Sequence, residues 1–174
     1  MKKEIKMFVT DIDGVWTDKS IYYNNDGDEY RRFNLSDSVG VLFLYLLNIP
    51  VIAISEENSE ILKRRIKKLR VNEYYLGATN KVAIISELLN KYNLDWDEVA
   101  FIGDDINDIK LLEKAGFSAT PAQASYYVKK NADLVLLNRG GEGAFREFVE
   151  KYLDAMGLLE ATVEKYLQIN ESFV

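Results

Sequence analysis

Short, mostly apolar runs alternate along this chain with segments of helical period, and this alternation constrains the fold more than any other feature. The runs have the length of buried strands. They lie at residues 7–10, 51–54, 73–76, 99–102, 117–119 and 134–137. Segments with helical spacing lie at residues 39–48, 59–70, 81–92, 108–115 and 145–156. Strands that alternate with helices form right-handed βαβ units, so we expect a parallel sheet covered on both faces.

One segment departs from this alternation. Residues 21–23 and 30–33 flank the sequence Asn24-Asn25-Asp26-Gly27, which is a strong turn signal and predicts a short β-hairpin. The expected fold class is therefore α/β, a Rossmann-like three-layer sandwich with a mainly parallel sheet and a short hairpin flap. Residues 159–167 have the spacing of a final amphipathic helix. We expect one domain over residues 1–156 and a helical extension over residues 157–174.

The chain contains no histidine and no cysteine, which narrows its chemistry sharply. Cysteine nucleophiles, Ser-His-Asp triads, disulfides and Cys/His zinc sites are excluded. Catalysis has to come from carboxylates, lysine, arginine, hydroxyl groups or a metal held by oxygen. Oxygen ligands favour Mg²⁺, Mn²⁺ or Ca²⁺.

Charge and hydropathy disfavour two classes of partner. The formal net charge is −6, whereas a nucleic-acid binder normally has a basic excess. The longest apolar stretch, residues 39–54, contains Gly40, Asn48 and Pro50 and is too short to cross a bilayer as one helix. Residues 1–6 are charged and lack the apolar core of a secretory signal. We expect a cytoplasmic protein that binds neither nucleic acid nor membranes.

Acidic residues follow two of the predicted strands. Asp11 and Asp13 come directly after the first strand, and an extended chain points both side chains the same way. Asp104, Asp105 and Asp108 follow a later strand. Active crevices of such sheets lie at the carboxyl ends of the strands, where a divalent cation would relieve the repulsion between these carboxylates. Taken separately, each cluster also fits a polar turn or a helix cap.

Two further polar residues occupy comparable positions. Ser55 follows the strand at 51–54, where a hydroxyl could donate to an oxyanion. Lys81 begins the helix at 81–92, where the helix dipole disfavours a cation unless an anion lies nearby. Neither residue stands out alone, because serines in turns are common and most lysines are simply solvated. Their order along the chain, between the two acidic clusters, is the informative feature.

In this order, Asp-x-Asp-Gly, Ser, Lys and Gly-Asp-Asp-x-x-Asp resemble the four motifs of the haloacid dehalogenase superfamily of phosphotransferases, over about residues 4–153. The resemblance implies that Asp11 is the nucleophile that forms an aspartyl-phosphate. It implies that Asp13 protonates the leaving alcohol and later activates water. Ser55 and Lys81 would bind the phosphoryl oxygens. A transition state of this charge needs positive groups and fixed donors around its oxygens.

The same resemblance implies a Mg²⁺ cofactor. The ligands would be the Asp11 carboxylate, the backbone carbonyl of Asp13 and the Asp104 carboxylate. Asp108, and with it Asp105, would orient the phosphate-binding lysine or metal-bound water. Haloacid dehalogenation itself is disfavoured, because it needs neither the metal site nor a second aspartate at position 13.

The segments between the motifs leave no room for the cap domain that many members carry. Residues 10–18, 33–38 and 139–147 resemble the capless sugar-acid phosphatases of the superfamily. The likeness is closer to those acting on 2-keto-3-deoxy-nononate 9-phosphate than to the alternative, those acting on 3-deoxy-D-manno-octulosonate 8-phosphate. A second alternative is an assembly module, like the related domains fused to sialic-acid cytidylyltransferases. The intact catalytic motifs argue against that module, because clustered buried acids have no structural use.

The resemblance also implies contacts with the substrate and with other subunits. Glu57, Arg65 and Lys68 fall where the nononate enzymes place leaving-group contacts, and Arg139 is a further candidate for the substrate carboxylate. For Arg65 and Lys68 the alternative is a solvated basic helix face. Enzymes of this group are tetramers in which a hairpin helps to cover a neighbour's site. We therefore expect a homotetramer that hydrolyses a small sugar-acid phosphate.

Overall fold

The computed structural model describes residues 4–27 and 29–171. The strands are β1 (Met7–Thr10), β2 (Tyr22–Tyr23), β3 (Glu29–Tyr30), β4 (Val51–Ser55), β5 (Glu73–Leu76), β6 (Val99–Ile102), β7 (Phe117–Thr120) and β8 (Leu134–Val135). The helices are α1 (Ser36–Leu46), α2 (Glu60–Lys68), α3 (Lys81–Tyr92), α4 (Ile109–Lys114), α5 (Tyr126–Lys129), α6 (Ala144–Ala155) and α7 (Leu159–Glu171). Two 3₁₀ turns, η1 (Trp96–Glu98) and η2 (Ile106–Asp108), complete the secondary structure of this part of the chain.

The sheet places β1 at its centre. Its strand order is β5-β4-β1-β6-β7-β8, and each of these pairs is parallel. After β1 the chain builds β4 and β5 on one side and then returns to build β6, β7 and β8 on the other. The switch of direction leaves a crevice at the carboxyl ends of β1 and β6, which is where ligands bind in open α/β sheets.

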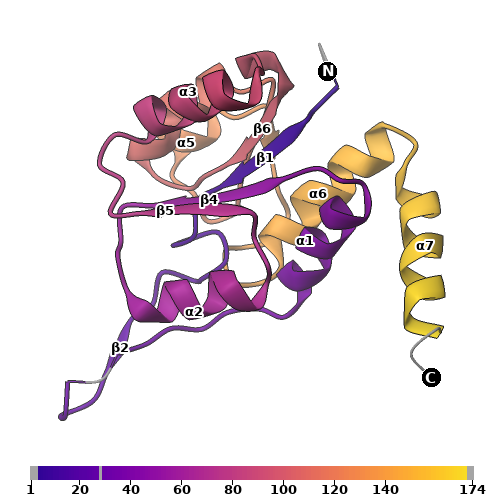
Figure 1. Cartoon of the computed structure of the whole chain (residues 1–174). Helices are drawn as coiled ribbons and strands as arrows, with labels where there is room; N and C mark the ends of the chain where they lie inside the picture. The colour runs from indigo at the N-terminus through magenta and orange to yellow at the C-terminus, as the bar shows by residue number, and fades with distance from the viewer. Residues whose placement is uncertain (1–3, 28, 172–174) are drawn as a thin grey trace.

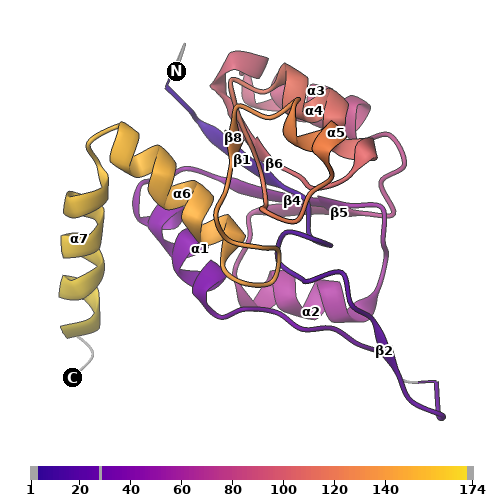
Figure 2. The same cartoon turned by 180° about the vertical axis from the view of Figure 1, so that it is seen from behind.

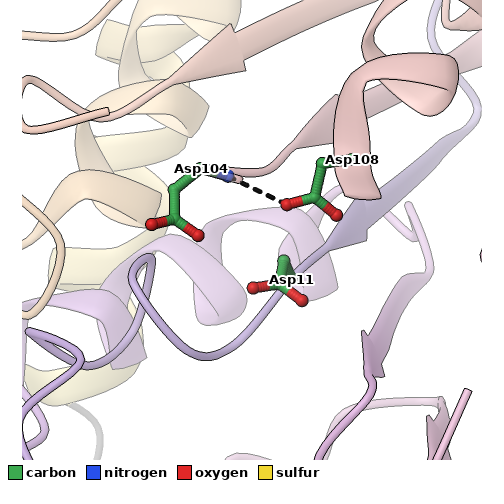
Figure 3. Close-up of side chains that lie close together, drawn as sticks. All are labelled: Asp11, Asp104 and Asp108. Atoms are coloured by element: carbon green, nitrogen blue, oxygen red, sulfur yellow. Dashed lines mark hydrogen bonds between the residues drawn. The ribbon is translucent and has the colours of Figure 1, made fainter. Parts of the chain in front are cut away.

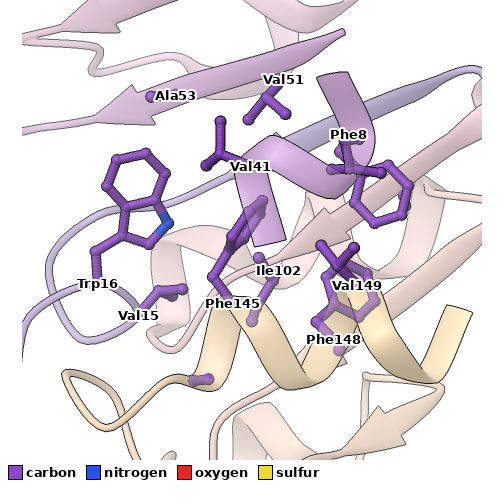
Figure 4. Packing of buried hydrophobic residues seen from close by; sticks show 14 of the residues in the cluster. Phe8, Val15, Trp16, Val41, Val51, Ala53, Ile102, Phe145, Phe148 and Val149 are labelled. Atoms are coloured by element: carbon purple, nitrogen blue, oxygen red, sulfur yellow. The ribbon is translucent and has the colours of Figure 1, made fainter. Parts of the chain in front are cut away.

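Two layers of helices cover the sheet, as the sequence predicted (Figures 1 and 2). Along β1, Phe8 points into the layer formed by α1, α2 and α6, whereas Met7 and Val9 point into the layer of α3, α4 and α5. The period-2 alternation of a strand explains this division, and burial on both faces explains the continuous apolar run. In the first layer, the Phe148 ring packs beside Phe8 (Figure 4), with ring centroids 5.4 Å apart. The Phe117 ring lies 5.1 Å from Phe148. The predicted three-layer α/β fold is confirmed.

The hairpin is shorter than the sequence predicted. β2 and β3 pair over two residues each, and Phe33 forms an isolated bridge with Thr17 in place of a longer strand. The hairpin is the insertion between β1 and α1, and the described residues contain no separate cap domain. It projects from the body of the molecule near α2 (Figure 1).

Two helices, α1 and α5, depart most from the sequence predictions. Helix α1 begins at Ser36, three residues before the predicted start, because the polar sequence Ser36-Asp37-Ser38 hides the first turn from an apolar pattern. Helix α5 was not predicted. Its exposed Tyr126 and Tyr127 break the apolar period, and the hydroxyl of Ser125 caps it by accepting from the backbone N–H of Val128.

The last helix packs on α1 and α6 at the edge of the molecule (Figure 1). Its Tyr166 ring meets Phe43 edge to face at 5.9 Å, and Lys165 donates to the backbone carbonyl of Leu46 at 2.6 Å. The division into residues 1–156 and 157–174 stays a prediction. Of the helices in the described part of the chain, none combines the length and the apolar character needed to span a bilayer.

Candidate active site

The carboxyl ends of β1, β4 and β6 open into one hollow of about 150 Å³. Its walls combine acids with lysines and a serine. The lining residues are Asp11, Asp13, Lys19, Ser55, Glu56, Glu57, Lys81, Asp104, Asp105 and Asn107. The four predicted catalytic residues and the predicted metal ligand Asp104 therefore lie together, although β1 and β6 are far apart in the sequence.

Lys81 is the buried cation of this hollow. Its ammonium donates to Asp11 Oδ1 at 2.7 Å and to Asp108 Oδ1 at 2.6 Å. Burial alone would lower the pKa of Lys81, but the two carboxylates outweigh burial and raise it above its ordinary value. The side chain is thus held as a cation, and its ion pairs explain how a lysine is tolerated at the start of α3.

Asp108 arranges the second acidic cluster. Its Oδ2 accepts from the backbone N–H groups of Asp104 and Asp105 at 3.0 and 3.2 Å. Its other oxygen binds the lysine described above. Both oxygens are therefore engaged, and the orienting role that the resemblance implies for Asp108 stays a prediction.

Three carboxylates face one another in the hollow (Figure 3). Asp11, Asp104 and Asp108 each offer an oxygen atom within 4.8 Å of the others. Gly14, in the turn after β1, lets the Asp104 carboxylate lie against the backbone of that turn. A Cβ at this position would lie 2.1 Å from Asp104 Oδ2. Its φ of +95° is also a conformation that residues with side chains rarely adopt. The turn after β1 therefore needs glycine for two reasons.

The residues present fit a divalent cation. Asp104 Oδ1 is buried and has no hydrogen-bond partner among the described residues. Burial raises the pKa of Asp104 to about 6, against the effect of a nearby lysine. Burial and the repulsion of Asp108 also raise the pKa of Asp11, and Lys81 opposes that shift. An all-oxygen set with an unpartnered buried carboxylate oxygen is what Mg²⁺ favours.

Asp13 also lines the hollow, with a different set of partners. Its Oδ1 accepts from Arg31 Nη1 at 2.6 Å and from the hydroxyl of Thr17 at 3.3 Å. Its Oδ2 has a longer contact of 3.4 Å with the hydroxyl of Ser55. The two aspartates after β1 thus have different environments, one beside a lysine and the other beside an arginine.

Sequence reasoning missed two cations of the site. Lys19 contacts Asp104 Oδ2 at 2.8 Å and Asp105 Oδ2 at 2.7 Å. Arg31 reaches Asp13 from the foot of the hairpin. A signal existed for Lys19, which immediately follows the motif that contains Asp11 and Asp13. Arg31 had no such signal, because the path of the hairpin decides where its side chain goes.

The predicted substrate-binding residues separate into two groups. Glu57 lines the hollow, but Arg65 and Lys68 do not. Arg65 donates to the backbone carbonyl of Asn34 at 2.7 Å. Lys68 lines a different, apolar hollow between α1 and α2. Within one chain, the structure does not bring these two cations to the acidic cluster.

Arg139 is exposed and does not line the hollow, but the glycines after it touch the turn that follows β1. Gly141 N–H donates to the carbonyl of Val15 at 3.0 Å. A Cβ on Gly140 would lie 1.9 Å from the carbonyl oxygen of Gly14. The pair of glycines is needed for this close approach.

Comparison with known proteins gives a consistent family. Residues 54–147 match the haloacid dehalogenase-like hydrolases. The 3-deoxy-D-manno-octulosonate 8-phosphate phosphatase KdsC of Haemophilus influenzae is 36% identical over 155 residues, which are 89% of this chain and 86% of that enzyme.

Two solved structures extend the similarity to three dimensions. A probable YrbI family phosphatase from Pseudomonas syringae superposes with a TM-score of 0.90 at 36% identity, covering 95% of this chain and 94% of the other. The octulosonate phosphatase of Moraxella catarrhalis, in complex with magnesium, phosphate and KDO, gives a TM-score of 0.89 at 30% identity and covers 93% of each chain.

Proposed function

Because this chain belongs to the haloacid dehalogenase-like hydrolases, and is a phosphoric monoester hydrolase that uses Mg²⁺, we propose that its substrate is 3-deoxy-D-manno-octulosonate 8-phosphate. The observation that carries this proposal is the similarity, over almost the whole chain, to phosphatases named for that substrate. The sequence motifs favoured the nine-carbon nononate 9-phosphate. The comparisons support the eight-carbon alternative better than that first expectation.

The reaction would begin at Asp11. A carboxylate oxygen of Asp11 attacks phosphorus, and the bond from phosphorus to the sugar oxygen breaks. The proton that the leaving oxygen needs comes from Asp13. The product of this step is an aspartyl-phosphate and a free sugar acid. Mg²⁺ held by Asp11, Asp104 and the backbone carbonyl of Asp13 would supply positive charge that offsets repulsion between the carboxylates and the phosphate.

The second half of the reaction would reverse the role of Asp13. Asp13 takes a proton from water, the water oxygen attacks phosphorus, and the bond to Asp11 breaks to release phosphate. Lys81 and the hydroxyl of Ser55 contact the phosphoryl oxygens in both halves. Fixed donors of this kind stabilise charge that develops on those oxygens. Asp108 keeps Lys81 in place through its ion pair.

Further predictions concern substrate contacts, assembly and location. Glu57 is proposed to contact the leaving group, since it lines the hollow beside Asp13. Substrate contacts by Arg65, Lys68 and Arg139, a homotetrameric assembly and a cytoplasmic location stay predictions. The assembly-module hypothesis is disfavoured, because the buried Lys81 with its two carboxylates is costly in a scaffold that has no substrate to bind.

The test is steady-state phosphate release by the full chain on the eight-carbon and the nine-carbon substrates. We expect the higher kcat/KM on the eight-carbon substrate and loss of turnover in excess EDTA. Rapid-quench experiments should detect a phosphoenzyme in the unmutated chain and none in Asp11→Asn. Full activity without metal, or normal turnover by Asp11→Asn, would refute the mechanism, and a preference for nine carbons would refute the substrate.

A further inference from the structure

The side chain of Arg31 is covered in an otherwise exposed part of the chain. Its side chain is 2% exposed, whereas the hairpin that carries it displays Tyr22, Tyr23 and Tyr30 to solvent. The next residue, Arg32, is 52% exposed. A buried guanidinium is costly unless it is paired, so the partners of Arg31 indicate what it does.

Those partners are carboxylates at the wall of the active-site hollow. Nη1 lies 2.6 Å from Asp13 Oδ1, and Nη2 lies 3.5 Å from Glu57 Oε2. Nε lies 2.6 Å from Glu29 Oε1, within the hairpin. Glu29 thus fixes the orientation of the guanidinium. The Nη1 end of the guanidinium points toward Asp13, the residue proposed as both acid and base.

The contact with Arg31 makes the two oxygens of Asp13 unlike. Oδ1 accepts from Arg31 and from Thr17. Oδ2 has only the 3.4 Å contact with the Ser55 hydroxyl among the described residues. A guanidinium has donors and no acceptor. The oxygen that faces it must therefore accept, and a proton carried by Asp13 has to lie on Oδ2.

We propose that Arg31 is a positioning residue that holds Asp13 by Oδ1, so that Oδ2 delivers the proton to the leaving oxygen. The inference rests on the function proposed above and deepens it. In the first half-reaction the proton passes from Asp13 Oδ2 to the sugar oxygen as the phosphorus–oxygen bond breaks. Arg31 then faces the carboxylate that remains. In the second half-reaction Oδ2 takes the proton from water.

A purely structural role for Arg31 predicts a different result, which depends on the leaving group. A sugar alkoxide is a strong base and has to be protonated as it leaves, whereas p-nitrophenolate is a weak base and leaves without a proton. Loss of the correct proton donor should therefore impair the sugar phosphate far more than p-nitrophenyl phosphate. Distortion of the hairpin or of phosphate binding would impair both substrates alike.

The experiment compares Arg31→Met with the matched control Arg32→Met, which removes the same charge from the adjacent position. The quantity is kcat/KM, because it ends at the step in which the leaving group departs. For Arg31→Met we expect a loss of about 10²-fold on the sugar-acid phosphate and a much smaller loss on p-nitrophenyl phosphate. Arg32→Met should leave both values near those of the unmutated protein.

Arg31→Lys covers the case in which Arg31→Met does not fold. A lysine keeps the charge but cannot bind Glu29 and Asp13 with one rigid fork, so we expect a smaller loss with the same selectivity. Equal losses on the two substrates, in whichever variant folds, would overturn the inference. If the unmutated chain hydrolyses neither substrate, the proposed function fails instead, and the two failures are thereby distinguishable.

Discussion

Acidic side chains at the ends of β1 and β6 outnumber the cations that touch them. Asp11, Asp104 and Asp108 are buried together, and the ammonium groups that contact them are those of Lys81 and Lys19. Lys81 is held between two of the acids. Lys19 is more exposed and contacts Oδ2 of Asp104. Oδ1 of the same carboxylate has no hydrogen-bond partner among the described residues. We infer that Lys19 competes with the metal for Asp104.

Removal of Lys19 should strengthen metal binding. Lys19→Met leaves Asp104 without a cation in the metal-free protein, so Mg²⁺ no longer has to displace one. We expect the Kd for Mg²⁺ to fall by about tenfold, or ~1.4 kcal/mol, in isothermal titration calorimetry without substrate. Lys110→Met is the control, since Lys110 lines a neighbouring hollow and carries the same charge. An unchanged or higher Kd in Lys19→Met would contradict the competition.

A second prediction at the residue scale concerns Asp37 and the dependence of stability on pH. It is buried beneath α6, where Oδ1 accepts from the backbone N–H of Arg146 and Oδ2 has no partner among the described residues. Burial raises the pKa of Asp37 from 3.8 to about 6, although Arg65 and Arg146 oppose the shift. Between these values the folded state keeps a proton that the unfolded state has lost, so stability falls as pH rises.

Asp37→Asn lacks this titration. The free energy of unfolding of the variant, minus that of the unmutated chain, should increase from pH 4 to pH 7 by up to about 3 kcal/mol. Urea unfolding at a series of pH values measures this difference. Asp154→Asn, at an exposed position on α6, should show none of it. A difference for Asp37→Asn that is independent of pH would show that the carboxyl titrates normally.

Among the elements, the loop between β8 and α6 supports the turn after β1. Gln123 links the two segments, because its amide donates to the carbonyl of Gly14 at 2.7 Å and accepts from Gly140 N–H at 2.8 Å. The contacts place this backbone against the turn that carries Asp13. We therefore expect a segment remote in sequence to support the geometry of the catalytic motif.

Gly140→Ala should damage catalysis through this contact. The added Cβ would lie 1.9 Å from Gly14 O, so the turn has to move. A shift of about 1 Å at such a site can cost 10²-fold in rate, and we expect a loss of that order in kcat/KM. Gly116→Ala is a matched control, because its Cβ would lie 2.0 Å from Asp97 O. This contact lies at the amino ends of β6 and β7, away from the catalytic motif.

Both variants should lose comparable stability in thermal unfolding, about 1–3 kcal/mol as in other overpacked sites. At temperatures where both are folded, Gly116→Ala should keep normal kcat/KM. Equal kcat/KM in the two variants would mean that the loop before α6 does not position the turn.

At the scale of the whole molecule, the hairpin is poorly buried within one chain. Tyr22, Tyr23 and Tyr30 are 55%, 69% and 55% exposed. A two-stranded ribbon of this size is marginal alone, and the active-site hollow beside it is open to solvent. Packing of hairpins between subunits in a closed symmetric assembly would bury the rings and cover the hollow.

We therefore predict a homotetramer, which multi-angle light scattering would detect as four times the chain mass of 20.0 kDa. Tyr23→Asp should reduce the mass of the assembly and lower kcat/KM together. Tyr126→Asp is the control, because Tyr126 is 82% exposed on α5 and distant from the hairpin. A species of one chain mass with full kcat/KM would rule out a site shared between subunits.

The sequence by itself determined the sheet, most of the helices and the candidate catalytic residues. The bounds predicted for β1, β5, α3 and β6 agree with the structure because apolar period and strand length are local properties. The acids met at one edge because parallel strands align their carboxyl ends, a rule that needs no coordinates. For the same reason Ser55 and Lys81 lie in the hollow as expected.

Only the tertiary structure decided which cations serve those acids. Lys19 reaches Asp105 across 86 residues, and Arg31 reaches Asp13 along the path of the hairpin. Arg65 instead lies over the ring of Phe33, and Lys68 lines a separate hollow. Charged side chains are long and polar, so neither local propensity nor apolar period fixes their direction. Their partners are set by how the elements pack, and packing is what a linear pattern does not contain.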